Sequence, residues 1–344
     1  MEHKIRQLAL DGFIERAGWG DAERIYLQAD ASFRRYIRLK RGSESVMLMD
    51  APPPQENIEP FLVVAKHLCQ LGFSAPRILQ EDAFLGFLLL EDFGDATFTQ
   101  LLNQGMGEGV LYEAAIDTLI KLHQHPDNAR VAIGEYDLEV LLTEAELFLD
   151  WYVPELDHTQ TPETLRQGFR DAWLDVLSHQ PKLNACIVLR DFHVDNLMLL
   201  PNRMNPENCG LLDFQDALIG SSSYDVASLL EDARRDISQE FRQNMLTRYL
   251  TGFTNLDREA FMTSYVMLSA QRHMKIVGIF TRLYRRDGKA HYLAHIPRVL
   301  AYLQQHLSHP VLAPVATWLK THTPEFTNLP DTLQISELTA PLES

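Results

Sequence analysis

The sequence has few basic residues for its size. Lys and Arg number 31 against 47 Asp and Glu, so the formal net charge is −16. A surface of this sign repels nucleic acid and anionic membranes, and we expect neither as a main partner. It does not exclude a small anion such as a nucleotide, because the local field inside a pocket decides that binding.

Cysteine is scarce, and long apolar runs are absent. The three cysteines, Cys69, Cys186 and Cys209, form no Cys-x-x-Cys spacing, so we expect reduced, buried side chains. No apolar run approaches the ~20 residues of a membrane span, and the start shows no basic-then-apolar signal pattern. These absences predict a cytoplasmic protein without a membrane partner, and we expect a monomer.

The stretch 185–216 carries a recognisable arrangement of polar residues. Apolar runs at 187–189 and 197–200 flank a loop with Asp191 and, five positions on, Asn196. A third apolar run ends at Asp213. Phosphoryl transfer needs such a set: one carboxylate for the proton of the attacking hydroxyl, and oxygen ligands for magnesium. We predict Asp191 as the catalytic base and Asn196 and Asp213 as Mg²⁺ ligands.

These motifs resemble those of a known superfamily. Leu-Arg190-Asp191-Phe-His-Val-Asp-Asn196 resembles the kinase catalytic loop, and Leu-Leu-Asp213-Phe-Gln215 resembles Asp-Phe-Gly with Gln for Gly. Over roughly 20–330 the chain is similar to the aminoglycoside phosphotransferase branch of the protein-kinase-like superfamily. The resemblance implies an α+β bilobal fold, with a small antiparallel β-sheet lobe at 1–92, a mostly helical lobe at 93–330 and a tail at 331–344. In such a kinase, we expect Arg190 or His193 to add positive potential near the transferred phosphoryl group.

Further motifs are similar to the anomeric sugar kinases of cell-wall recycling. They are Ser-Phe-Arg-Arg-Tyr at 32–36 and Met-Asp-Ala-Pro-Pro at 49–53, joined to the catalytic motifs. This resemblance implies that ATP and Mg²⁺ are used to phosphorylate the C1 hydroxyl of N-acetylmuramate and N-acetylglucosamine, giving an α-1-phosphate. The expected partner is therefore a small amino sugar.

Two features of the kinase pattern are missing from the first lobe. The expected phosphate loop, residues 30–35, has no glycine, and the third strand, 46–50, has no lysine. We predict that Ser32, Phe33 and Arg34 hold the nucleotide, with Arg34 or Arg35 supplying the missing charge; a solvated turn is the alternative. The resemblance implies that the backbone of Glu91 and Phe93 meets the adenine.

The sequence gives the least information about which residues bind the acceptor. A predicted helix at 137–152 carries Glu144 and Trp151 in a stripe typical either of a core or of a sugar platform. A predicted helix at 257–286, with Gly278 as a candidate bend, carries Arg272, Lys275 and Arg282 on one face. That basic face either receives an anionic acceptor or is solvated. The predicted acceptor residues are Glu144, Trp151, Asp195, Tyr224, Arg234 and Arg272.

Two other functions stay open from the sequence. One is a kinase of another small acceptor: an aminoglycoside, choline or homoserine. The other is a non-catalytic nucleotide-binding pseudokinase, which the missing lysine and glycines favour. The intact Asp191, Asn196 and Asp213 argue against it, because a scaffold is free to lose them.

Overall fold

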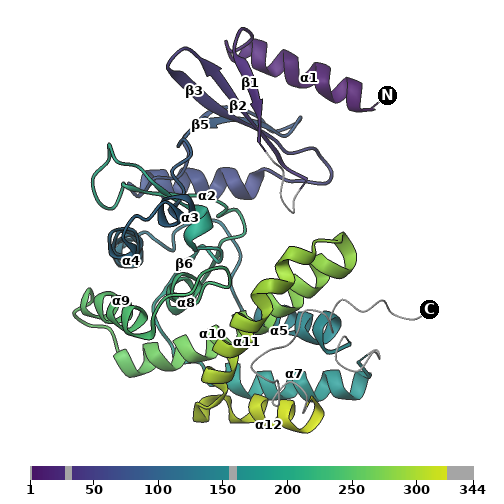
Figure 1. The fold of residues 1–344 in the computed structure, drawn as a ribbon, viewed down its shortest axis with the longest axis vertical. Coiled ribbons are helices and arrows are strands. Elements are labelled where there is room, and N and C mark those ends of the chain that lie inside the picture. Colours follow the sequence, from purple (N-terminus) through teal and green to yellow (C-terminus); the bar gives the residue numbers. More distant parts are fainter. Residues whose placement is uncertain (1, 28–32, 155–160, 324–344) are drawn as a thin grey trace. The chain divides into compact units, whose positions relative to one another are not determined.

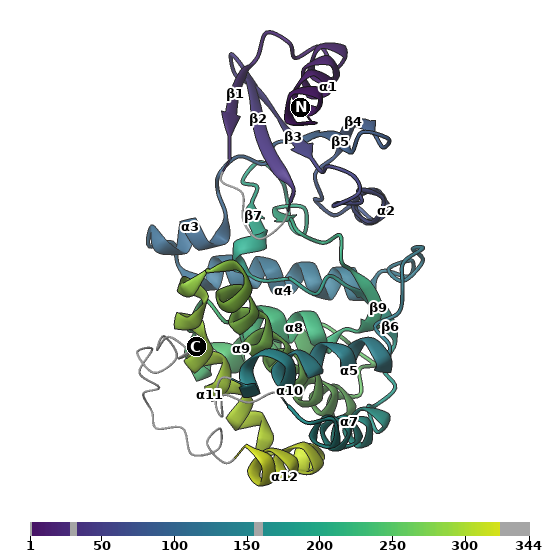
Figure 2. The same ribbon diagram turned by 90° about the vertical axis from the view of Figure 1, so that its right-hand side faces the viewer.

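The computed structural model describes residues 2–27, 33–154 and 161–323 (Figures 1 and 2). Ser32 and the predicted tail 331–344 lie outside these residues. Contacts divide the chain into two compact units, which we describe separately. Unit 1 is Met1–Ile133 with Leu189–Leu218, and unit 2 is Gly134–Val188 with Ile219–Ser344. The predicted lobe boundary after residue 92 stays a prediction.

Unit 1 contains the predicted small antiparallel sheet. Its five strands lie in the order β1-β2-β3-β5-β4, and each neighbouring pair is antiparallel. β2 and β3 form a hairpin in which Arg41 pairs with Glu44, and Gly42 takes the left-handed φ of 60° that the tight turn needs. The strands are β1 (Glu23–Tyr26), β2 (Arg35–Arg41), β3 (Glu44–Asp50), β4 (Ile78–Asp82) and β5 (Phe87–Glu91).

The two faces of this sheet have different tasks, because successive strand residues point to opposite sides. One face packs against helix α1 (Glu2–Arg16) through Leu10, Phe13 and Ile14. Each such buried side chain contributes about 1.5–3 kcal/mol. The opposite face is left to line a pocket. The strand residues under α1 are Ile37, Leu39, Val46, Leu48, Phe87 and Leu89.

The rest of unit 1 is helical apart from one short ribbon. Thr97 caps α3 by accepting a hydrogen bond from the backbone NH of Gln100. β7 and β8 pair antiparallel, with Leu197 opposite Leu211. The elements are α2 (Glu59–Gln70), α3 (Phe98–Asn103), α4 (Glu108–Gln124), the 3-10 turn η2 (Val194–Asn196), β7 (Leu197–Leu199) and β8 (Cys209–Leu211).

Unit 2 is built around the long helix α10 (Arg258–Asp287), which contacts α5, η1, α8, η3 and α11. Asp257 caps its start, and Gly288, with a left-handed φ of 69°, ends it. The other elements are α5 (Leu138–Leu147), η1 (Phe148–Tyr152, one π-helical turn), α7 (Glu163–Ser178), β6 (Ala185–Val188), β9 (Leu218–Ser221), α8 (Ser223–Leu230), α9 (Gln239–Thr251), η3 (Ala290–His295), α11 (Ile296–Leu307), η4 (Pro310–Leu312) and α12 (Ala313–His322).

α10 continues through Gly278 without interruption, and a bend at this residue stays a prediction. A Cβ at this position would lie 2.3 Å from the carbonyl oxygen of Leu147, at the end of α5. The glycine is therefore required for the close approach of two helices.

Among the described residues, no helix is both long and apolar enough to cross a bilayer. The cysteines are free; Cys186 and Cys209 are buried as predicted, whereas Cys69 is half-buried.

A buried carboxylate joins three helices of unit 2. Glu231, just after α8, accepts hydrogen bonds from Tyr265 (2.8 Å) on α10, and it lies 2.7 Å from His273 Nε2 on α10 and 2.8 Å from His306 Nε2 on α11. Burial alone would raise the pKa of the Glu231 carboxyl, but the two histidines outweigh it and hold the pKa below its usual range. Burial lowers the pKa of His273 to about 4, although Glu231 opposes that shift.

This cluster predicts a loss of stability in mild acid. His273 is neutral in the folded protein but takes up a proton near pH 6.5 when unfolded, so stability falls as the pH drops from 6.5 towards 4. Below pH ~4.5 the depressed pKa of Glu231 adds to the loss. We expect Tm to be a few degrees lower at pH 5 than at pH 7. In the non-titrating variant His273→Gln the difference should shrink; an unchanged difference would show that other groups cause it.

Candidate active site

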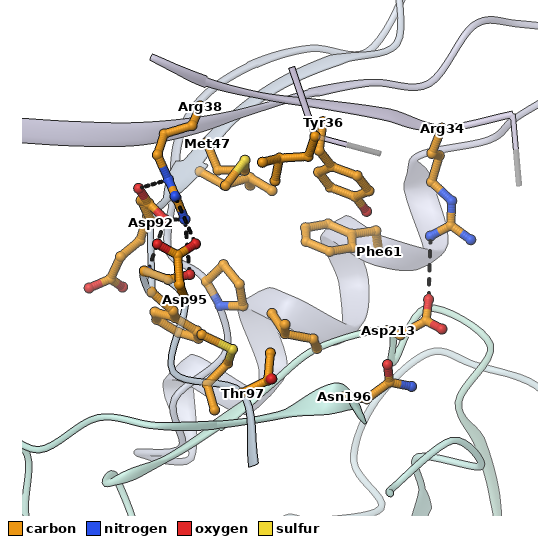
Figure 3. A pocket seen from close by; sticks show the side chains of 18 of the residues that line it. Arg34, Tyr36, Arg38, Met47, Phe61, Asp92, Asp95, Thr97, Asn196 and Asp213 are labelled. Carbon is orange, nitrogen blue, oxygen red and sulfur yellow. Dashed lines mark hydrogen bonds and ion pairs between the residues drawn. The ribbon is translucent and has the colours of Figure 1, made fainter. Parts of the chain in front are cut away.

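A pocket of about 720 Å³ opens on the face of the sheet opposite α1 (Figure 3). Its lining residues all belong to unit 1. This volume suits a nucleotide-sized ligand. The middle of the pocket wall is apolar, and polar groups lie at both ends, with Arg34, Asn196 and Asp213 at one end and Arg38 with Asp92 and Asp95 at the other. The apolar lining includes Leu27, Met47, Phe61, Leu90, Met198 and Leu212, and the polar lining includes Arg34, Tyr36, Arg38, Asn196, Asp213 and Gln215.

The loop after Leu189 is fixed through the backbone of Asp191. The Asp191 carbonyl accepts a hydrogen bond from the His193 NH at 3.1 Å and another from the Asn196 side-chain amide at 3.0 Å. Both bonds use the main chain of Asp191, and its side chain is half-buried. The loop is therefore held rigidly around a carboxylate, as a catalytic base requires.

Strand pairing brings Asn196 and Asp213 together. Asn196 immediately precedes β7 and Asp213 follows β8 by two residues, and β7 and β8 are antiparallel neighbours. The Leu212 NH donates to the Asn196 carbonyl at 2.9 Å, which continues the ladder to the edge of the pocket. Figure 3 shows the two side chains side by side. The predicted pair of oxygen ligands is thus assembled by one short β-ribbon.

Two non-glycine residues of the described chain have a positive φ, and both lie in this site: Arg190 at 69° and Asp213 at 55°. Such a conformation is costly for residues with a Cβ and persists where surrounding contacts enforce it. Arg190 is held by a 2.9 Å hydrogen bond from Nη1 to the Asp216 carbonyl. Both strained residues lie in segments that the sequence predicts to be functional, and their roles stay predictions.

The surroundings of Asp213 fit a bound cation. Burial, and next the carboxylate of Asp191, raise the pKa of the Asp213 carboxyl, although half of the side chain is exposed. A cation between such groups would remove the repulsion. The nitrogen of the Asn196 amide is already used by the Asp191 carbonyl, so its oxygen is the group left for a cation. Hard oxygen donors of this kind suit Mg²⁺.

Gln215 stands where the kinase motif has glycine, and its contact in the structure was not predicted from the sequence. Its side-chain nitrogen donates a 2.9 Å hydrogen bond to Asp213 Oδ1. The residue that replaces the glycine of the kinase motif therefore orients the carboxylate two positions before it. A glycine could not do this.

Arg34 supplies a cation at the polar end of the pocket. Its Nη1 lies 4.0 Å from Asp213 Oδ1 (Figure 3), and its Nε lies 3.4 Å from Glu56 Oε2. Glu56 Oε1 also accepts a 3.1 Å hydrogen bond from the Phe33 NH. Glu56 thus holds both the guanidinium and the backbone of the preceding loop. The pair holds a guanidinium at the end of the pocket beside Asp213; its substitution for the missing strand lysine stays a prediction.

A second arginine at the opposite end of the pocket was not predicted. Arg38 contacts Asp92 at 2.6 Å, Asp95 at 2.8 Å and the Gly94 carbonyl at 2.9 Å. It therefore ties strand β2 to the segment after β5 (Figure 3). The signal was present in the sequence, because Arg34, Tyr36 and Arg38 alternate with period two and so share one face of an extended chain.

Of the other residues predicted to contact the nucleotide, two line the pocket and one does not. Phe93 lines the pocket, with the Arg203 guanidinium 5.3 Å from its ring centre. Glu91 also lines it, while its carboxylate pairs with Arg77 at 3.0 Å. Phe33 is 66% exposed and is not among the lining residues. The nucleotide contacts of these three residues stay predictions.

The predicted acceptor residues of unit 2 include an interlinked polar group. Glu144 on α5 accepts from Lys275 on α10 at 2.8 Å and hydrogen bonds with the Tyr136 hydroxyl. Lys275 also lies 3.4 Å from the Tyr224 hydroxyl. Lys275 and Arg272 are buried, so the solvated alternative for the basic face is wrong at these two positions.

Three predicted acceptor residues have structural contacts of their own. Asp195 in unit 1 accepts a hydrogen bond from Thr99 on α3. Arg234 lies over the Phe280 ring at 5.8 Å. Trp151 is half-buried beside Phe148 and Tyr152, which are fully buried; the core interpretation of that stripe holds for those two. Acceptor contacts of all the named residues stay predictions.

Comparison with known proteins decides the family. The profile of the phosphotransferase enzyme family matches residues 25–261, more than half of the chain. The chain belongs to the phosphotransferase enzyme family. The resemblance read from the catalytic motifs is therefore confirmed, and the protein is a phosphotransferase.

Members of this family with curated names support the same placement. The chain is 33% identical to the N-acetylmuramate/N-acetylglucosamine kinase of Caulobacter vibrioides, over 93% of this chain and 97% of that protein. It is 41% identical to the protein of the same name from Pseudomonas aeruginosa, over 83% and 85%.

Two solved structures share the fold at low sequence identity. The aminoglycoside phosphotransferase APH(2'')-Ib with ADP bound gives a TM-score of 0.55 at 17% identity, covering 83% of this chain and 94% of that one. Choline kinase LicA from Streptococcus pneumoniae gives 0.58 at 11% identity, covering 86% and 99%. The predicted α+β, protein-kinase-like fold class is confirmed.

Proposed function

We propose that this phosphotransferase is an ATP- and Mg²⁺-dependent sugar kinase. It transfers the γ-phosphoryl group to the C1 hydroxyl of N-acetylmuramate and of N-acetylglucosamine, giving the α-1-phosphate. We place this reaction in the cytoplasm, in peptidoglycan recycling. The observation that carries the proposal is the intact set of Asp191, Asn196 and Asp213 in a chain whose relatives, matched over 93% and 83% of it, are named as kinases of these sugars.

The residues of this chain have separate tasks in that reaction. The Asp191 carboxylate accepts the proton of the attacking hydroxyl as the new O–P bond forms, and it orients that hydroxyl before attack. Asn196 and Asp213 would hold Mg²⁺, which when bound neutralises charge on the β- and γ-phosphates. The residue before Asp191, Arg190, has the strained positive φ of 69°.

Arg34 replaces the phosphate-binding lysine in this proposal, and Glu56 holds it in position. A guanidinium preset at the charged end of the pocket stabilises negative charge that grows in the transition state. The arrangement is built from a loop arginine and a glutamate that precedes α2. This arrangement argues against the pseudokinase alternative, because the positive charge of Arg34 then replaces that of the missing lysine.

We expect Arg34→Met to lower kcat/KM for ATP by about 10- to 100-fold, because one preorganised donor to the phosphates is lost. Glu56→Gln should give a smaller loss in the same parameter. Arg35→Met, at the exposed neighbouring position, is the matched control and should stay within about twofold. Equal effects of Arg34→Met and Arg35→Met would remove the assigned role.

The proposed function is tested by incubating the protein with ATP, Mg²⁺ and each sugar and following the products by phosphorus NMR. An anomeric sugar phosphate is the expected product. Choline, homoserine and an aminoglycoside serve as competing acceptors. Transfer to one of these and to neither sugar would replace the proposed substrate; ATP binding without transfer to any acceptor would favour the scaffold.

A further inference from the structure

Arg272 is a buried cation without an internal partner. It lies within α10, and 3% of the residue is exposed. Its Nη1 is buried and has no hydrogen-bond partner. Across the described residues, no hydrogen bond or ion pair engages its guanidinium. A buried charge is costly unless it is paired, so such an arginine indicates a missing anion.

Several carboxylates of unit 2 are engaged by groups other than Arg272. Lys275, one turn further along α10, forms an ion pair with Glu144 at 2.8 Å. The buried Glu231 is shared by Tyr265 and the two histidines of its cluster. Other acids of unit 2 pair with other arginines: Asp232, through Oδ1, with Arg234, Asp236 with Arg298, and Asp287 with Arg286. The anion that would pair with Arg272 is therefore not supplied by these acids.

A second buried donor lies beside Arg272. Ser269 is three residues earlier, on the same face of α10. Its hydroxyl oxygen is buried and also has no partner. A guanidinium and a hydroxyl on adjacent turns can donate together to the two oxygens of one carboxylate. The conjunction of two unsatisfied donors distinguishes this position from a solvated basic face.

We propose that Arg272, assisted by Ser269, binds a carboxylate of the acceptor and sets the preference between acidic and neutral amino sugars. This inference rests on the proposed function. The two sugars named for the relatives differ by a lactyl ether, whose carboxylate N-acetylmuramate carries and N-acetylglucosamine lacks. A planar guanidinium matches a carboxylate, whereas a neutral sugar gives it nothing to bind.

The test compares wild type, Arg272→Met and Arg272→Lys with three acceptors: N-acetylmuramate, its methyl ester and N-acetylglucosamine. The ester keeps the lactyl bulk and removes the charge. For N-acetylmuramate, we expect Arg272→Met to lower kcat/KM by about 10- to 100-fold, as for loss of a charged hydrogen bond. For the ester and N-acetylglucosamine, kcat/KM should change less than about twofold. Arg272→Lys should recover part of the loss, because it restores charge without the planar geometry.

Folding is checked separately, with Arg258→Met as the matched control at an exposed position in the first turn of the same helix. Because Arg272 has no internal partner, Arg272→Met should leave Tm unchanged or raise it. Equal losses with all three acceptors, or no loss with any, would overturn the inference and leave the proposed function intact.

Sugar binding is measured by calorimetry in parallel, so the inference is tested even if no phosphate is transferred. Wild type that transfers phosphate to neither sugar overturns the proposed function alone. Binding of N-acetylmuramate that disappears in Arg272→Met then still supports the carboxylate site. Binding that survives the substitution, or no binding to wild type, overturns the site.

Discussion

We expect the Asp191→Asn variant to lose about 10²- to 10⁴-fold in kcat, the usual contribution of a general base. Asparagine has the shape of aspartate but cannot take the proton of the attacking hydroxyl. The fold of the loop should survive, because its hydrogen bonds run to the carbonyl of residue 191, which the substitution leaves in place. The loss should therefore appear in kcat, with ATP affinity close to that of wild type.

Single-turnover kinetics and ATP titration separate these two effects. Asp171→Asn, a change of the same kind at an exposed position of α7, is the control for removal of one negative charge. Activity within tenfold of wild type in Asp191→Asn would show that the carboxylate is not the base. Reduced ATP affinity with unchanged kcat would assign Asp191 to nucleotide binding instead.

The second large effect is expected for Asp213→Asn, with at least a 10²-fold loss of activity and loss of the magnesium dependence of ATP binding. Removing the charge weakens the pair of ligands formed with Asn196. Asparagine tolerates the left-handed φ of 55° at this position, so the variant isolates charge from backbone strain. Substitution of Asp213 by alanine would change the charge and the backbone preference at the same time.

Calorimetric titration of ATP at several Mg²⁺ concentrations measures this prediction without relying on turnover. Wild type should bind ATP more tightly as Mg²⁺ rises, and Asp213→Asn should show a flatter dependence. The same dependence in both proteins would exclude Asp213 as a ligand. Gln215→Gly, which removes the 2.9 Å hydrogen bond to Asp213, should give an intermediate result.

The sequence was informative where function depends on residues close together in the chain. The spacing of Asp191 and Asn196, and the apolar run before Asp213, predicted a group that one short β-ribbon does assemble. The helices predicted at 137–152 and 257–286 likewise correspond to α5 with η1 and to α10. These features depend on local geometry, which a linear pattern encodes.

Contacts between residues far apart in the sequence could not be predicted from such a pattern. Glu56 and Arg34 are 22 positions apart, so their pairing depends on how α2 is joined to the sheet. The basic face of α10 could be recognised from spacing, but spacing cannot tell a buried face from a solvated one. Only packing shows that Lys275 has a partner and Arg272 does not.

The alternation of strand β2 limits how this protein can change. Odd-numbered Ile37 and Leu39 pack beneath α1, whereas even-numbered Tyr36 and Arg38 line the pocket. Inserting or deleting one residue near the start of the strand would exchange these sets, placing a guanidinium in the core and aliphatic groups in the pocket. Changes of two residues would keep the parity. Homologous enzymes can therefore tolerate substitutions in this strand, or insertions and deletions of two residues. We expect them not to tolerate insertion or deletion of a single residue.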